Sequence, residues 1–123
     1  MIFFKWVMKM AKANTFFNFD MLVLSVLNAR DCYGYEICKM IREISHGALD
    51  IKEGTLYPVV HTLLKKEYIS SYDIIAGKRI RVYYKLEESG KDYLMTVRDE
   101  FRKNIQGVFD ILEYGEKGNV DEE

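Results

Sequence analysis

Residues 53–69 constrain the fold of this chain more than any other stretch, because the period of the apolar residues changes at the end of it. Apolar residues recur there every three or four positions: Leu56, Val59, Val60, Leu63 and Leu64. This spacing predicts an amphipathic helix. Pro58 is tolerated only near a helix start, where a missing N–H matters least, so the helix is expected to begin close to residues 53–55. After Lys66 the period falls to two, which predicts a strand.

A β-hairpin is predicted to follow this helix. Residues 68–75 are rich in β-branched and aromatic side chains, and residues 79–86 alternate. One face of the second strand carries Ile80, Val82, Tyr84 and Leu86, and the other carries Arg79, Arg81, Tyr83 and Lys85. Residues 76–78 contain a glycine and predict a tight turn. We therefore expect a hairpin with a basic, exposed tip.

Two further helices are predicted before residue 53. Residues 16–29 are apolar nearly all round, so this helix is expected to be central and buried. Residues 34–45 place Ile37, Ile41 and Ile44 on an inner face. Three helices followed by a hairpin constitute a winged helix-turn-helix, a mainly α (α+β) fold, which we predict over residues 16–88. In this fold the exposed start of the third helix, with Lys52, Thr55 and Tyr57, has the geometry of a recognition helix.

A long last helix is predicted over residues 89–114. Its apolar residues are spaced three or four apart: Leu94, Val97, Phe101, Ile105, Val108 and Leu112. A helix longer than the domain beneath it leaves much of this stripe facing water, so the stripe predicts a homodimer. Residues 115–123 are expected to form a frayed acidic tail. Residues 1–15, with Phe3, Phe4 and Trp6, are expected to be an N-terminal arm that adds to the dimer; binding of the arm to a membrane surface is the alternative.

The charge distribution is uneven although the net charge is only −1. Residues 52–85 contain seven basic and three acidic residues, whereas residues 110–123 contain six acidic residues and one basic one. The middle of the chain is therefore a local basic region that suits phosphate contact. Apolar residues make up 49% and charged residues 30% of the 123, which is typical of one globular domain.

The chain resembles the PadR family of transcriptional regulators from about Leu22 to Leu112. The resemblance rests on three short motifs in order, Tyr33-Gly34-Tyr35-Glu36-Ile37, Gly54-Thr55-Leu56-Tyr57-Pro58, and Tyr83-Tyr84-Lys85-Leu86 followed by Gly90. It implies a dimeric repressor that binds double-stranded DNA. Two recognition helices in such a dimer predict a pseudo-palindromic operator, and the use of two unpaired cysteines predicts a cytoplasmic location. In the family this chain resembles, the last helix dimerises, the third helix enters the major groove, and the wing contacts the flanking backbone.

The resemblance matches two candidates for DNA contact to the start of the third helix and three to the wing: Thr55, Tyr57, Lys78, Arg79 and Arg81. Lys52 and His61 are further candidates, because they lie at the start and on the polar side of the same helix. The candidates for dimerisation are the six residues of the last stripe, chosen by their spacing. Family members often have Thr where this chain has Glu87, so Ser89 or Glu87 is expected to cap the last helix instead. Some members bind flat aromatic drugs between tryptophans of the two last helices. Phe101 matches that position, which leaves a small aromatic effector open.

Other function classes find little support in the sequence. Cys32, Cys38, His46 and His61 lack the close paired spacing of zinc ligands, and the two cysteines are expected to be reduced. No nucleophile elbow, phosphate-cradling loop or carboxylate pair is present, so we expect neither an enzyme nor a cofactor. The opening residues show neither a signal peptide nor a membrane span. The competing hypothesis is a winged-helix module that binds protein, which a hydrophobic or acidic wing would favour.

Overall fold

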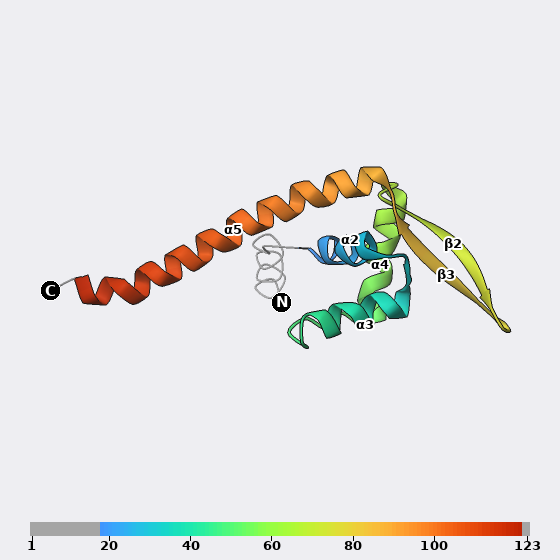
Figure 1. Cartoon of the computed structure of the whole chain (residues 1–123), viewed down its shortest axis with the longest axis horizontal. Helices are drawn as coiled ribbons and strands as arrows, with labels where there is room; N and C mark the ends of the chain where they lie inside the picture. Colours follow the sequence, from blue (N-terminus) through green and yellow to red (C-terminus); the bar gives the residue numbers. More distant parts are fainter. Residues whose placement is uncertain (1–17, 122–123) are drawn as a thin grey trace, which may run out of the picture. The chain divides into compact units, whose positions relative to one another are not determined.

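The computed structural model describes residues 18–121, and within them the predicted helices and strands occur in the predicted order, with one short strand in addition. The elements are α2 (Phe19–Ala29), β1 (Cys32–Tyr33), α3 (Gly34–Ile44), α4 (Glu53–Lys65), β2 (Ile69–Ala76), β3 (Arg79–Leu86) and α5 (Glu88–Asp121) (Figure 1). The predicted arm, residues 1–15, lies outside the described residues. Residues 19–97 form one compact unit, and the later part of α5 belongs to a second. The predicted fold class, helices with a small sheet and a long last helix, is confirmed.

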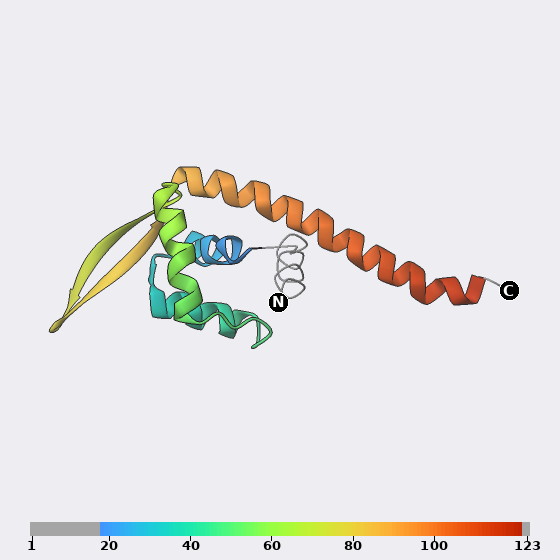
Figure 2. The same cartoon turned by 180° about the vertical axis from the view of Figure 1, so that it is seen from behind.

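The core of the first unit lies where α2, α3 and α4 pack on one another. Their most buried side chains are Val23, Leu24, Ile37, Leu56, Val60 and Leu63, each 2% exposed or less. The helix α4 crosses α2 and also contacts α3 (Figure 2). The apolar stripe of α4 faces this core, as its spacing predicted, so the opposite surface of α4 remains exposed.

The sheet is antiparallel, with strand order β1-β3-β2. The strands β2 and β3 pair along their whole length, from Ile69 opposite Leu86 to Ala76 opposite Arg79. Their two-residue turn begins at Gly77, whose φ of 64° suits the first central position of a hairpin turn. The short strand β1 adds two pairs, Cys32 opposite Tyr84 and Tyr33 opposite Tyr83. This third strand was not predicted; it lies between the helices that were predicted over residues 16–29 and 34–45.

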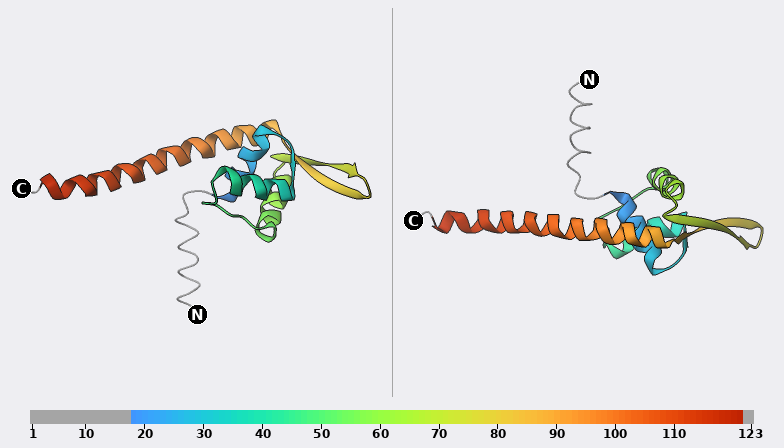
Figure 3. Two further views of the ribbon diagram at one scale, coloured as in Figure 1. Left: turned by 60° about the horizontal axis from the view of Figure 1, so that its bottom comes forward. Right: turned by 90° about the horizontal axis from the view of Figure 1, so that it is seen from above.

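Two predicted inner faces are only partly buried. Ile80 and Val82 were assigned to the same face as the buried Tyr84 and Leu86, yet they are 67% and 42% exposed. The reason is that the hairpin, yellow in Figure 3, extends past the helices, so that only its base is covered. Ile44 is 62% exposed because it is the last residue of α3, where the chain turns away through Ser45.

The helix α5 is longer than predicted. It has 34 residues, which corresponds to about 51 Å, and it takes in most of the stretch that was expected to fray. An ion pair between Lys117 and Glu113 (2.8 Å, one turn apart) supports its last part. Leu94, a predicted dimerisation residue, is only 4% exposed and belongs to the core of the first unit.

Hydrogen bonds and close packing join the start of α5 to the elements before it. The hydroxyl of Ser89 donates to the carbonyl of Glu67 (2.8 Å), and the carboxylate of Glu87 accepts from Ser70 (2.6 Å). These two side chains were predicted to cap α5, but their bonds hold the helix to β2 and to the turn before it. Tyr93 stacks on Tyr68 with ring centroids 4.6 Å apart, and its hydroxyl donates to Asp20 of α2 (2.8 Å).

Candidate nucleic-acid interface

The exposed surface of α4 carries three of the predicted DNA-binding residues. Thr55, Tyr57 and His61 all lie on this surface, because Leu56, Val60 and Leu63 of the same helix are turned into the core. Lys52 precedes them at the N-cap position. The structure therefore places Lys52, Thr55 and Tyr57 near the start of α4, where backbone N–H groups and the helix dipole favour an anion, whereas His61 lies one turn beyond Tyr57.

Lys52 is not an independent cation. Its ammonium group lies 2.9 Å from the carboxylate of Asp50, in an exposed ion pair. The hydrogen bond from Lys52 lowers the pKa of Asp50, and the charge of this carboxylate offsets part of the lysine's charge. Lys52 was predicted to contact DNA, and Asp50 now competes with DNA for its ammonium group.

Tyr57 has a structural role beside its predicted one. Its side chain lies against Gly34 at the start of α3, where a Cβ atom would come within 2.8 Å of the Tyr57 hydroxyl and 3.2 Å of the ring. Partial burial raises the pKa of the hydroxyl. The residue is still 48% exposed. Tyr57 therefore packs α4 on α3 while part of its side chain remains exposed to solvent. The contact also explains the glycine at position 34, because a larger residue there would collide with the Tyr57 ring.

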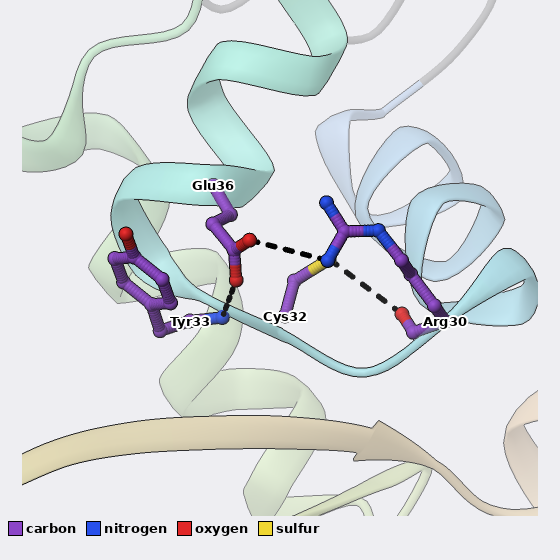
Figure 4. A network of polar contacts seen from close by, with 4 residues as sticks. All are labelled: Arg30, Cys32, Tyr33 and Glu36. Carbon is purple, nitrogen blue, oxygen red and sulfur yellow. Dashed lines mark hydrogen bonds and ion pairs between the residues drawn. The ribbon is translucent and has the colours of Figure 1, made fainter. Parts of the chain in front are cut away.

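A small polar network holds the start of α3 (Figure 4). The carboxylate of Glu36 accepts a hydrogen bond from the backbone N–H of Tyr33 (3.2 Å) and another from the guanidinium of Arg30 (3.1 Å). The first bond satisfies an N–H at the helix start, as in one half of a capping box. The second raises the pKa of Arg30. The network fixes the direction in which the chain leaves β1 and enters α3.

Lys78 and Arg79 occupy the tip of the wing, and both are exposed as predicted. Arg81 lies two residues further down β3 and is half-buried. Its guanidinium carbon lies 4.6 Å from the centroid of the Tyr33 ring, in a cation–π contact with the start of α3. The three predicted wing cations are thus not equivalent, since Arg81 already has an aromatic partner within the protein.

Four tyrosines form a cluster that joins the wing to β1 and to the start of α3, and this cluster was not predicted: Tyr33, Tyr35, Tyr72 and Tyr83. Tyr83 stacks on Tyr72 (5.8 Å between centroids) and meets Tyr33 edge to face (5.4 Å), while Tyr35 stacks on Tyr33 (6.4 Å). The Tyr72 hydroxyl donates to Asp31 (2.7 Å), and this bond raises the pKa of Tyr72 to about 12. The alternation in β3 did place Arg81 and Tyr83 on one face. The rest of the cluster was not predicted because β1, which places Tyr33 opposite Tyr83, has only two residues and shows no sequence period.

The four residues weighed as metal ligands do not form a site. Cys32 and Cys38 are free and buried, whereas His46 and His61 are exposed. Burial raises the pKa of both thiols and so disfavours the thiolate that a metal needs. In the part of the chain from residue 18 to 121, no three metal-binding side chains come together. Over the same residues, no helix is both long and apolar enough to cross a membrane.

Comparison with known proteins identifies the family. Residues 23–96 match the family described as "Transcriptional regulator PadR-like family". A protein of Lysinibacillus sphaericus, named only as uncharacterised, is 35% identical over 98 residues, which cover 78% of this chain and 88% of that protein.

Solved structures agree with this family. A PadR family transcription regulator of Clostridium difficile R20291 is 35% identical, with a TM-score of 0.68 and coverage of 77% of this chain and 99% of that one. The PadR protein of Bacillus subtilis, solved with operator DNA, is 26% identical, with a TM-score of 0.59 and coverage of 63% of this chain and 44% of that one. The chain belongs to the PadR-like family of transcriptional regulators, whose members are not enzymes.

Proposed function

We propose that this protein represses transcription in the cytoplasm by binding a pseudo-palindromic DNA operator as a homodimer. The observation that carries this function is the exposed surface of α4, with Thr55, Tyr57 and His61, together with the basic wing turn on the same compact unit. The Bacillus subtilis PadR structure with operator DNA supports the proposal through its shared fold. The start of α4 reads bases in the major groove, and the wing turn contacts phosphates.

The later part of α5 supports the homodimer. Beyond Arg98 the predicted stripe continues with Phe101, Ile105, Val108 and Leu112. Leu112 is 58% exposed, and Phe109, beside the stripe, is 59% exposed. A helix with a continuous, partly exposed apolar stripe buries it most simply against a copy of itself. Two recognition helices then read half-sites about 10 bp apart, or a multiple of that distance.

A small aromatic effector is the second element of the proposal. Phe101 and the aromatic side chain of Phe109 lie on the same helix, two turns apart, in the segment that we assign to dimerisation. Flat aromatic compounds stack on such rings with energies that suit reversible binding. Binding of an effector between two copies of α5 would change the spacing of the two recognition helices and so release the operator.

The substitution Arg79→Ala tests the DNA-binding function. We expect it to weaken binding to all duplex sequences alike and to lower the slope of log K against log salt by about one unit, because one phosphate contact is lost. Fluorescence anisotropy with a labelled duplex at several salt concentrations measures both quantities. Arg102→Ala is the matched control, since Arg102 is also exposed but lies on α5.

Unchanged affinity and an unchanged salt slope would contradict a role of the wing turn in DNA binding. If Arg79→Ala leaves affinity and salt slope at the wild-type values, and Arg79→Ala combined with Lys78→Ala does so as well, the wing turn does not contact DNA. The protein-binding module then becomes the better hypothesis. If only Arg102→Ala reduces the slope, the DNA lies against α5 instead of the wing.

A further inference from the structure

The side chain of Tyr93 joins the start of α5 to both α4 and α2. Tyr68 follows the end of α4, and its backbone N–H donates to the carbonyl of Leu63 in that helix (3.1 Å), so Tyr68 is tied to α4. The ring of Tyr93 stacks on the ring of Tyr68, with centroids 4.6 Å apart and an angle of 15° between the planes. The hydroxyl of Tyr93 donates to the carboxylate of Asp20 in α2 (2.8 Å). Figure 2 shows the start of α5 beside the end of α4.

The stack and the hydrogen bond of Tyr93 have different requirements. A stacked pair needs only two aromatic rings, and phenylalanine meets this need as well as tyrosine does. The hydroxyl of Tyr93 is required for the bond to Asp20, which is charge-assisted because its acceptor is a carboxylate. This carboxylate also accepts from the N–H of Met21 (2.7 Å), which limits its movement. The Tyr93–Asp20 bond joins residues 73 positions apart, so it stabilises neither helix by itself but fixes α5 against α2.

The contacts before Tyr93 fix where α5 begins but constrain its direction less. The bond from the Ser89 hydroxyl to the Glu67 carbonyl lies in the first turn. Tyr93 lies about one turn further along the helix and supplies a second point of attachment. Leu94 beside it is buried, but apolar packing has no preferred direction, whereas a hydrogen bond weakens as it departs from linearity. Two directional bonds one turn apart therefore set the line along which α5 continues.

The direction of α5 matters because the proposed dimer contact lies further along the same helix. From Tyr93 to Val108 an α-helix rises about 22 Å, so a tilt of about 5° at Tyr93 moves Val108 by about 2 Å. Successive bases along one DNA strand are about 3.4 Å apart. In a symmetric dimer each copy adds its own tilt, so a small change at Tyr93 shifts the two α4 helices relative to each other by on the order of one base step.

We infer that Tyr93, through Asp20 and Tyr68, is a positioning residue that sets the spacing between the half-sites of the operator. This inference rests on the proposed function and adds to it a residue that determines specificity without contact to DNA. A merely structural Tyr93 would affect stability and the affinity for every duplex alike. A positioning Tyr93 affects the preference among half-site spacings, while each copy of the chain still binds a single half-site as before.

The substitution Tyr93→Phe tests the inference, because it keeps the stack on Tyr68 and removes the bond to Asp20. The probes are an operator duplex selected from a random pool by the wild-type protein, the same duplex with one base pair inserted between the half-sites, and a single half-site. We expect the wild type to prefer the selected duplex over the one with the insertion. Tyr93→Phe should lower this preference about fivefold and leave the affinity for a single half-site unchanged.

Two further variants show whether the bond itself is responsible. Tyr72→Phe is the matched control, since it removes a similar bond to an aspartate, from Tyr72 to Asp31 in the wing (2.7 Å), and should keep the wild-type preference. Asp20→Ala should lower the preference as Tyr93→Phe does, because it removes the acceptor of the same bond. A wild-type preference in both Tyr93→Phe and Asp20→Ala, or an equal loss in Tyr72→Phe, would overturn the inference. Failure of the wild type to select any duplex would instead overturn the proposed function.

Pulsed electron paramagnetic resonance gives a second readout that needs no DNA. A spin label attached through Lys65→Cys reports the distance between the two α4 helices of a dimer, because Lys65 is exposed at the end of α4. Cys32 and Cys38 are buried and take up the label slowly. We expect a broader or shifted distance distribution in Tyr93→Phe and the wild-type distribution in Tyr72→Phe. An unchanged distribution in Tyr93→Phe would contradict the positioning role, and the absence of any measurable distance in the wild type would overturn the homodimer and the inference with it.

Discussion

The double substitution Ile105→Glu, Leu112→Glu in α5 is expected to convert the protein into a monomer and to weaken operator binding by on the order of a hundredfold. Both residues lie on the apolar stripe of the second unit. In a symmetric dimer the change places four carboxylates at the contact between the two helices. Removing an unpaired charge from water costs several kcal/mol, which exceeds what the remaining apolar contacts supply. Each monomer then binds only one half-site, so the gain from joining two sites is lost.

Analytical ultracentrifugation at micromolar concentration measures the first effect, and anisotropy on a full operator and on a single half-site measures the second. Ile111→Glu is the control, because Ile111 is 72% exposed and lies off the stripe on the same turn of helix. We expect it to remain dimeric. A double variant that sediments as a dimer would place the interface elsewhere, and residues 1–15 would then be the first segment to test.

The helical part of the fold was predictable because its signals are local. In α4 the apolar spacing, the position of Pro58 and the change of period after Lys66 each act within a few residues. The structure begins α4 at Glu53 and β2 at Ile69, close to the predicted positions. Such signals describe which face of an element is apolar. They do not describe how far a neighbouring element reaches to cover that face.

The predictions for the wing and for the end of α3 were wrong because a local pattern shows which face is apolar but not whether another element covers it. The alternation of β3 correctly put Ile80 and Val82 on the face that includes Leu86, but the helices cover only the base of the hairpin. Covering depends on contacts between residues far apart in sequence. The strand β1 was missed for the same reason, because two residues show no period and Cys32 becomes a strand residue only by pairing with Tyr84.

The candidate site was predictable at the level of surfaces but not of side-chain partners. The stripe of α4 determines that Thr55, Tyr57 and His61 are exposed. No local pattern shows that Arg81 lies over Tyr33, or that Tyr57 packs on Gly34. Both contacts join elements that are brought together only by the tertiary fold. They change the expected roles, since Arg81 and Tyr57 help to position the wing and α4 as well as presenting polar groups.

Gly90→Ala is expected to have the largest effect on stability. Gly90 lies in the first turn of α5, and a Cβ atom there would overlap the backbone carbonyl oxygen of Tyr68 and come within 2.7 Å of Leu86. Neither neighbour can move freely, because the Tyr68 carbonyl accepts a hydrogen bond from the N–H of Glu87 (3.0 Å) and Leu86 is buried. Overpacking of this kind costs about 3 kcal/mol, whereas the better helix propensity of alanine returns at most about 1 kcal/mol. A net loss of about 2 kcal/mol lowers the midpoint of thermal unfolding by about 10 °C.

Gly107→Ala separates this packing effect from the intrinsic preference of the helix. A Cβ atom at Gly107 meets no other atom within 4 Å, and the residue lies in the middle of the same helix. Alanine should therefore leave the free energy of unfolding unchanged or raise it by up to about 1 kcal/mol. Differential scanning calorimetry of the two variants and the wild type, at one protein concentration, measures the difference. If Gly90→Ala melts with Gly107→Ala instead of well below it, α5 does not pack closely on the Tyr68 carbonyl, and the glycine after the Tyr83-Tyr84-Lys85-Leu86 motif would need another explanation.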